Sequence, residues 1–264
     1  MFLPKPGATI RGGLRWRVDA RPAGRHAAGV PPRFDSEHRQ DGDRGEHGGF
    51  TPLYLQALMD RDARRARGVI ETAVEAGMPV PDIYAEIFEP ALREVGHLWA
   101  IEQLNVAQEH FATSVTQGLV AVLGPQIRVP PTEGRLAIVT SAPDELHQLG
   151  VQMVSDLLEA EGWEVVSLGA ATPAHDLIEL VEMECPDLVA LSASTAGRLP
   201  GVAEVLPRLA ALRPRPLVVV GGSLFTGEAG ELAKELGADL VISDARALVA
   251  VLRERFGIPE PEVG

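Results

Sequence analysis

The chain has 264 residues, of which 45% are hydrophobic and 23% charged, a composition typical of a globular protein with a sizeable core. Its 24 Lys and Arg against 37 Asp and Glu give a formal net charge of −13, which argues against a general nucleic-acid binder. A single cysteine excludes an internal disulfide framework and a cysteine-based zinc site, and no apolar run approaches the roughly 20 residues of a membrane span. We therefore expect a cytoplasmic protein without a membrane partner.

Residues 1–50 contain almost no periodic hydrophobicity and are rich in Gly, Pro and Arg. Such a segment cannot bury enough apolar surface to offset its ordering entropy, so we predict a disordered tail. The tail holds nine basic and six acidic residues, which leaves 15 basic and 31 acidic residues in the rest of the chain. A weakly basic tail thus precedes a strongly acidic body, and a functional basic arm remains an alternative for the tail.

Residues 51–128 show apolar residues at helical spacing in three stretches. The first stretch covers 53–74 and the second 83–99, with Gly and Pro residues between them. In the third, Asn105 followed three residues later by Gln108 has the pattern of a capping box, so a helix should begin there and run to the next Gly-Pro pair. We predict a bundle of three or four helices.

Residues 133–257 alternate short apolar runs with amphipathic segments. Runs of Val and Leu without alternation are typical of strands buried on both faces, hence of a parallel sheet. The expected strands are 136–141, 164–169, 188–194, 217–222 and 240–243, and the expected helices are 147–161, 174–184, 201–213, 225–236 and 245–256. This predicts a doubly wound, five-stranded domain of flavodoxin type, whose ligands bind at the carboxyl ends of the strands. Cys185, at the expected end of the second helix, is interpreted as a buried thiol.

The loop after the first strand contains His147, with Glu145 two residues before it and Gly150 three after it. Neutral imidazole is a good ligand for a transition metal, and a nearby carboxylate can hold its other ring nitrogen. The alternative is a polar histidine near the start of a helix, since Glu-x-His-x-x-Gly alone is a weak motif.

Two further features end the third and fourth strands, namely Ser192 with Ser194, and the pair Gly221–Gly222. The hydroxyl groups could bond a polar ligand, and adjacent glycines would let a bulky group lie against the backbone. Helix capping by the serines and a tight turn at the glycines are the alternatives.

The three features together resemble the cobalamin-binding domain shared by methionine synthases, corrinoid carrier proteins and base-displacing mutases. In that family Asp-x-His-x-x-Gly is followed by Ser-x-Thr or Ser-x-Leu and then Gly-Gly, at spacings like those here, where 41 residues separate Gly150 from Ser192 and 26 separate Ser194 from Gly221. Glu145 stands where the family has Asp, and Ser194 where it has Thr or Leu. Both departures keep the chemical role.

The resemblance implies that His147 coordinates cobalt in place of the cofactor's own dimethylbenzimidazole, and that Glu145 holds the imidazole from behind. It also implies that Ser192 and Ser194 contact the displaced base. Gly221 and Gly222 would line the tunnel that receives this base.

Trp99 in the helical segment is followed, after nine residues, by Glu109 and His110. This resembles the light-sensing cobalamin domains of CarH-like, MerR-type repressors, where the Trp packs over an adenosyl group and the Glu and His help to enclose it. There a His follows the Trp and can bind cobalt after photolysis, but here that position is Ala100. His97 is a conceivable substitute, although a histidine favoured by the carboxyl end of its helix explains it better.

We expect no counterpart of the DNA-binding domain of those repressors in residues 1–49, because this segment is too short and too poor in apolar residues. The resemblance therefore implies a photosensor, not an enzyme, that binds adenosylcobalamin, self-associates and signals to a protein partner without touching DNA. Methylcobalamin or hydroxocobalamin are alternative cofactors, and a non-covalent bilin stays open. The alternative function is a corrinoid carrier for a methyltransferase. His175, at the start of a sheet-domain helix, is interpreted as a surface residue.

Overall fold

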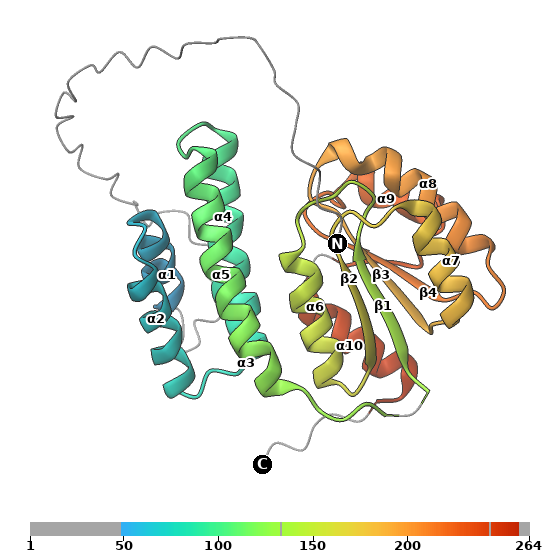
Figure 1. Cartoon of the computed structure of the whole chain (residues 1–264), viewed down its shortest axis with the longest axis horizontal. Helices are drawn as coiled ribbons and strands as arrows, with labels where there is room; N and C mark the ends of the chain where they lie inside the picture. The colour runs from blue at the N-terminus through green and yellow to red at the C-terminus, as the bar shows by residue number, and fades with distance from the viewer. Residues whose placement is uncertain (1–48, 133, 243, 259–264) are drawn as a thin grey trace, which may run out of the picture. The chain divides into compact units, whose positions relative to one another are not determined.

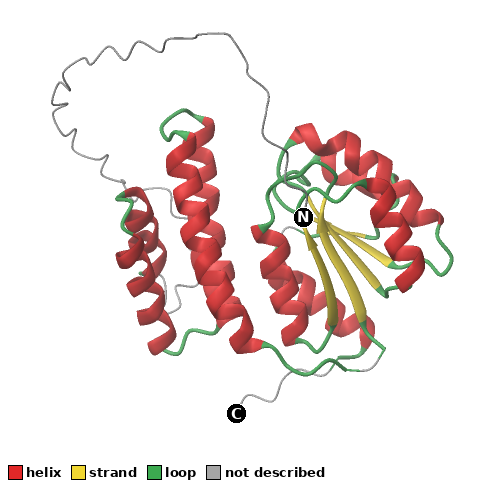
Figure 2. Cartoon of the chain, in the orientation of Figure 1, coloured by secondary structure: helices red, strands yellow, loops and turns green. Residues whose placement is uncertain are grey.

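The computed structural model describes residues 49–132, 134–242 and 244–258, all of which belong to one compact unit (Figure 1). Of the tail predicted to be disordered, residues 1–50, residues 1–48 lie outside the described residues, whereas Phe50 is the first residue of a helix. No helix in the described part of the chain is long and apolar enough to cross a membrane. The described residues form a helical part followed by a five-stranded sheet covered by helices, which confirms the predicted fold class (Figure 2).

The helical part contains five α-helices and one π-helix within the described residues. They are α1 (Phe50–Met59), α2 (Ala63–Glu75), α3 (Val80–Asp82), η1 (Ile83–Phe88), α4 (Glu89–Ala100) and α5 (Val106–Ile127). The capping box at the start of α5 is confirmed, because the side chains of Asn105 and Gln108 each accept a hydrogen bond from the other's backbone. Unlike the expected helix end, α5 continues past Pro125.

The first apolar stretch is divided into two helices, although its helical spacing is unbroken in the sequence. Arg61 takes a left-handed backbone conformation with φ of 57°, and Asp62 caps α2 by accepting the Arg65 N–H at 2.9 Å. The two helices then fold back on each other around buried Tyr54, whose hydroxyl lies 2.8 Å from that of Thr116 on α5.

The sheet has the parallel strand order β2-β1-β3-β4-β5, the flavodoxin-type order. Its strands are β1 (Leu136–Ser141), β2 (Glu164–Gly169), β3 (Leu188–Ser192), β4 (Leu217–Gly221) and β5 (Leu240–Val241). Ser141 pairs with Ser192, and Ser192 pairs with Gly221, so these three residues form one row across the carboxyl ends of β1, β3 and β4. Loops that follow this row must lie side by side.

Helices cover both faces of the sheet, as doubly wound topology requires (Figure 1). They are α6 (Leu149–Ala160) and α10 (Ala245–Phe256) on one face, and α7 (Ala174–Glu184), α8 (Leu199–Ala211, preceded by the 3₁₀ turn η2, Ala196–Arg198) and α9 (Glu228–Glu235) on the other. The burial predicted for Cys185 is wrong. This residue ends α7 in a left-handed conformation with an exposed thiol, because the chain turns there toward β3.

The helical bundle packs on the sheet domain mainly through α5 against α6. A Cβ atom on Gly124 would collide with the carboxylate of Asp156, so a glycine is needed where these helices approach each other. The buried Asp156 carboxylate accepts a hydrogen bond from the Tyr84 hydroxyl at 3.0 Å and one from Arg128 at 3.3 Å. Burial raises the pKa of Asp156, although both of these hydrogen bonds oppose the rise.

Candidate functional site

The loop after β1 holds a histidine clamped by a buried carboxylate. One oxygen of Glu145 lies 2.5 Å from Nδ1 of His147 and accepts the backbone N–H of the same residue at 3.1 Å. The other oxygen accepts the backbone N–H of Ser194, beyond β3, at 2.8 Å. Because an ionised carboxylate only accepts hydrogen bonds, the imidazole proton resides on Nδ1. Nε2 makes no hydrogen bond among the described residues, and 57% of the His147 side chain is exposed.

Electrostatics keep Glu145 ionised. Burial of this side chain, which is 1% exposed, opposes ionisation. The backbone hydrogen bonds from Ser194 and His147, together with the imidazole, outweigh burial and lower the pKa of Glu145. The carboxylate is therefore charged at neutral pH and orients the imidazole so that Nε2 is available as a metal ligand.

Three further hydrogen bonds hold the loop that carries Glu145 and His147. The Ser141 hydroxyl donates to the carbonyl oxygen of His147 at 2.8 Å. The N–H of Ala142 donates to the carbonyl of Ser192 at 2.8 Å, and the N–H of Ala171 to the carbonyl of Glu145 at 2.9 Å. The imidazole is thus presented by a loop tied to β3 and to the end of β2.

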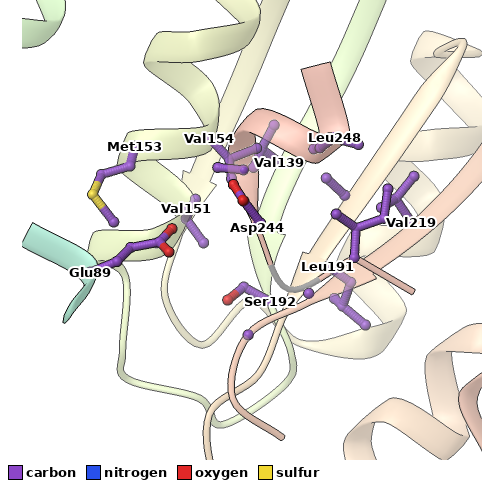
Figure 3. A pocket seen from close by; sticks show the side chains of 16 residues that line it. Glu89, Val139, Val151, Met153, Val154, Leu191, Ser192, Val219, Asp244 and Leu248 are labelled. Carbon is purple, nitrogen blue, oxygen red and sulfur yellow. The ribbon is translucent and has the colours of Figure 1, made fainter. Parts of the chain in front are cut away.

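A cavity of about 110 Å³ opens beside the same row of strand ends (Figure 3). It lies between the sheet and the helices α6 and α10. Four of the residues predicted from the sequence line it, namely Gly150, Ser192, Gly221 and Gly222. Ser194 does not line it. Its backbone N–H donates to Glu145, and its carbonyl accepts the Ser223 hydroxyl at 3.0 Å.

The two glycines are required by the backbone around them. A Cβ on Gly221 would lie 2.8 Å from the carbonyl oxygen of Ile242, and one on Gly222 would collide with the carbonyl of Ala193. Gly222 also has φ of 101°, a conformation that other residues rarely adopt. These contacts keep the cavity wall free of side chains at this point.

The tip of the bundle carries the other three predicted residues. Trp99 lies in the last turn of α4 and is 47% exposed, while Glu109 and His110 lie in the first turn of α5. Glu109 accepts the Thr113 hydroxyl at 2.8 Å and lies 3.6 Å from the His110 ring. The start of α5 and the end of β1 lie at the same end of the molecule (Figure 1). Within the described residues, however, no hydrogen bond or ion pair joins these three side chains to His147.

Two acidic residues that the sequence interpretation missed also line the cavity, Glu89 from the bundle and Asp244 from the start of α10. Burial and the charge of Asp244 raise the pKa of Glu89 to about 7, although Arg93 and Arg246 oppose this rise. Asp244 directly follows the fifth predicted strand, so the rule that sites form at the carboxyl ends of strands could have found it. Glu89 has no comparable signal, because it reaches the cavity from the other part of the fold.

The remaining histidines considered above lie at the surface. His97 is exposed in the last turn of α4, two residues before Trp99, and Ala100 ends the same helix. His175 is 78% exposed and lies 3.9 Å from Glu179, which confirms its interpretation as a surface residue.

Comparisons with known proteins match both parts of the fold. Residues 135–252 and residues 53–123 each match a family described as B12 binding domain. The HTH-type transcriptional repressor CarH of Myxococcus xanthus is 31% identical over 171 residues, which cover 64% of this chain and 56% of the repressor. The chain therefore spans little more than half of that relative.

Corrinoid proteins are also among the similar proteins. The trimethylamine corrinoid protein of Methanosarcina barkeri is 25% identical over 209 residues, which cover 77% of this chain and 94% of that protein. The structure of the monomethylamine corrinoid protein of the same organism superposes with a TM-score of 0.68 at 21% identity, covering 78% of this chain and 98% of that one. This superposition supports the shared fold of bundle and sheet domain.

Proposed function

Because residues 53–123 and 135–252 belong to the B12 binding domain family, we propose that the chain holds a cobalamin whose cobalt is coordinated by Nε2 of His147. The observation that carries this proposal is the contact between the Glu145 carboxylate and Nδ1 of His147. A buried, ionised carboxylate fixes the imidazole and leaves its other nitrogen exposed and without a partner among the described residues. This is the arrangement expected of a metal-binding histidine that donates its other ring N–H to a carboxylate.

The cavity beside the strand ends suits the base that His147 would displace from cobalt. Val139, Leu191 and Val219 give it apolar walls, and the Gly221–Gly222 backbone leaves room for a flat ring. Ser192 would supply a hydroxyl group at the cavity wall. The backbone N–H of Ser194 donates a hydrogen bond to Glu145. Ser194 would therefore act by holding the carboxylate that orients His147 rather than by contacting the base.

We further propose a photosensor that uses adenosylcobalamin, on the basis of Trp99, Glu109 and His110 at the bundle tip. When bound, adenosylcobalamin supplies a cobalt–carbon bond that light cleaves. Trp99 is a large, exposed aromatic side chain in the last turn of α4, and it would pack on the adenosyl group. Loss of that group would remove a contact of the bundle tip, and the bundle is the element whose position would change. The output would be altered self-association or a changed surface for a protein partner.

A corrinoid carrier for a methyltransferase is the second candidate. It is favoured by the coverage of the trimethylamine corrinoid protein, 94% of which matches this chain. A methyl group, however, needs neither a large aromatic roof nor polar partners, so Trp99 with Glu109 and His110 favours the photosensor. The two candidates make different predictions for the effect of light on self-association.

Illumination of the loaded protein tests the photosensor. Protein reconstituted with adenosylcobalamin in the dark should change both its absorption spectrum and its size-exclusion profile after green light. Protein loaded with hydroxocobalamin, which lacks the adenosyl group, is the control and should change neither. A spectral change with an unaltered profile in the presence of adenosylcobalamin would contradict signalling through self-association, and no spectral change would contradict the photosensor.

The contact between Glu145 and His147 leads to a separate prediction. Glu145→Gln removes the charge that orients His147, so we expect cobalamin affinity to fall by about 10- to 100-fold in absorbance titrations. The matched control is Glu179→Gln, which alters the exposed Glu179–His175 pair and should leave the affinity unchanged. Equal affinities for the Glu145 variant and the unmodified protein would show that the charge of Glu145 is not needed to hold His147 as the cobalt ligand.

A further inference from the structure

Glu89 is held over the cavity by contacts between the bundle and α10. Arg246, in the first turn of α10, makes ion pairs with Asp82 at 3.1 Å and with Glu86 at 3.0 Å. Asp82 lies directly before the π-helix η1 and Glu86 lies within it. A π-helix is a widened helical turn that is frequent at functional sites. The ion pairs fix this segment against the start of α10, and Glu89 follows η1 directly as the first residue of α4.

The carboxyl group of Glu89 is the bundle's polar contribution to a largely apolar cavity. In Figure 3 its side chain extends from the bundle toward the residues of the sheet domain that line the cavity. The Asp244 carboxylate is occupied as a helix cap, since it accepts the backbone N–H of Arg246 at 2.8 Å. Glu89 has only a distant ion pair among the described residues, with Arg93 of its own helix at 4.0 Å, and its side chain is 21% exposed. It is therefore free to bond a group that enters the cavity.

We propose that Glu89 bonds the heteroaromatic base of the cofactor's nucleotide tail, so that the helical bundle detects whether a tail occupies the cavity. This inference rests on the proposed function, because it requires a corrinoid bound through His147. It adds a specificity for corrinoids that carry a base over those that do not. It also links the cavity directly to the bundle, because Glu89 begins α4 and Trp99 lies in the last turn of the same helix.

The charges around Glu89 indicate the form in which it acts. Asp244 faces it from α10 and disfavours its ionisation, while Arg93 and Arg246 favour ionisation. Arg246 is already engaged by Asp82 and Glu86. A base that enters the cavity would strip water from Glu89 and favour its neutral form, which can donate to a ring nitrogen. Binding of the tail should therefore take up a proton and weaken as the pH rises through about 7.

The test compares aquocobalamin with diaquocobinamide, the same corrin without the nucleotide tail. For the unmodified protein, we expect the affinity for aquocobalamin relative to diaquocobinamide to fall by about fivefold between about pH 6 and about pH 8. Glu89→Ala should weaken aquocobalamin binding at the lower pH by about five- to tenfold and change diaquocobinamide binding by less than about twofold. Glu89→Gln should retain much of the affinity and lose the pH dependence. Glu94→Gln, on the same helix but outside the cavity, is the matched control and should behave like the unmodified protein.

The outcomes separate this inference from the proposed function. If the unmodified protein binds neither corrinoid, the proposed function fails. If it binds both and Glu89→Ala weakens both equally, or neither, the contact with the tail is overturned while the cobalamin site stands. A loss confined to the corrinoid that carries a base supports the inference, since a merely structural role for Glu89 would affect both ligands.

Discussion

His147→Ala is expected to weaken cobalamin binding by about 100-fold or more, because it removes the proposed axial ligand and not merely its support. Glu145 would then keep its hydrogen bond from Ser194 but lose the imidazole that it orients. Any cobalamin that still binds should show the spectrum of a corrinoid coordinated by its own base or by water. Absorbance titration in the dark measures both the affinity and the coordination state.

The control for this variant is His175→Ala, which removes an exposed histidine that is also adjacent to a glutamate. It should bind cobalamin like the unmodified protein. Adding imidazole to the His147 variant should restore part of the original spectrum, because a free imidazole can enter the vacated space. Unchanged affinity and spectrum in His147→Ala would refute the ligand assignment.

Gly222→Ala is expected to lower the free energy of unfolding by about 2–4 kcal/mol. Two costs combine at this position. The backbone conformation with φ of 101° is unfavourable for alanine, and the new Cβ would collide with the carbonyl of Ala193. Relief of the collision requires the end of β4 to move away from β3, which should distort the cavity and weaken cobalamin binding as well. Urea denaturation measures the first effect and titration the second.

Gly227→Ala separates the cost of the unfavourable backbone conformation from the cost of the collision. Gly227 also has a positive φ, of 54°, but a Cβ there would meet no atom within 4 Å. This variant should lose about 1–2 kcal/mol, from backbone strain alone, and bind cobalamin normally. If Gly222→Ala were no more destabilising than Gly227→Ala, the close approach of β3 and β4 would not be the reason for the glycine.

The sheet domain could be predicted from sequence because its signals are local and agree with one another. The apolar runs 136–141 and 164–169 coincide with β1 and β2, and the helix expected at 174–184 coincides with α7. The rule that sites form at strand ends then places the loop with His147 beside Ser192 and Gly221, as the observed pairing of β1, β3 and β4 requires. The parallel topology thus converts separate motifs into one site.

The features that could not be predicted depend on contacts between distant segments. The break at Arg61 interrupts a continuous helical pattern, and beyond it α1 and α2 fold back on each other and contribute Tyr54, Ala66 and Ile70 to one core. Pro125 looks like the end of a helix but lies within the final turn of α5, where the loss of one hydrogen bond is tolerated. Glu89 reaches the cavity because the bundle packs on the sheet domain, and Arg246 pairs with Asp82 and Glu86 in the segment before it. No local pattern signals that pairing.

The roles of Trp99, Glu109 and His110 come from resemblance rather than from local pattern. The structure puts all three at the α4–α5 turn, where Trp99 is exposed and Glu109 already bonds Thr113. An exposed tryptophan at a helix end has no structural explanation among the described contacts, which is consistent with a ligand-covering role. The proposed adenosyl contact therefore stays a prediction, to be tested by illumination.

The central claim is that His147, and not the cofactor's own base, occupies the lower position at cobalt. Electron paramagnetic resonance of the protein loaded with cob(II)alamin, after growth with nitrogen-15 histidine, tests this most directly. The nuclear spin of nitrogen-15 splits each cobalt line into a doublet, whereas nitrogen-14 splits it into a triplet. We predict doublets in the labelled protein and triplets in an unlabelled sample. Triplets in both samples would show that the unlabelled base of the cofactor remains the ligand and would contradict the account.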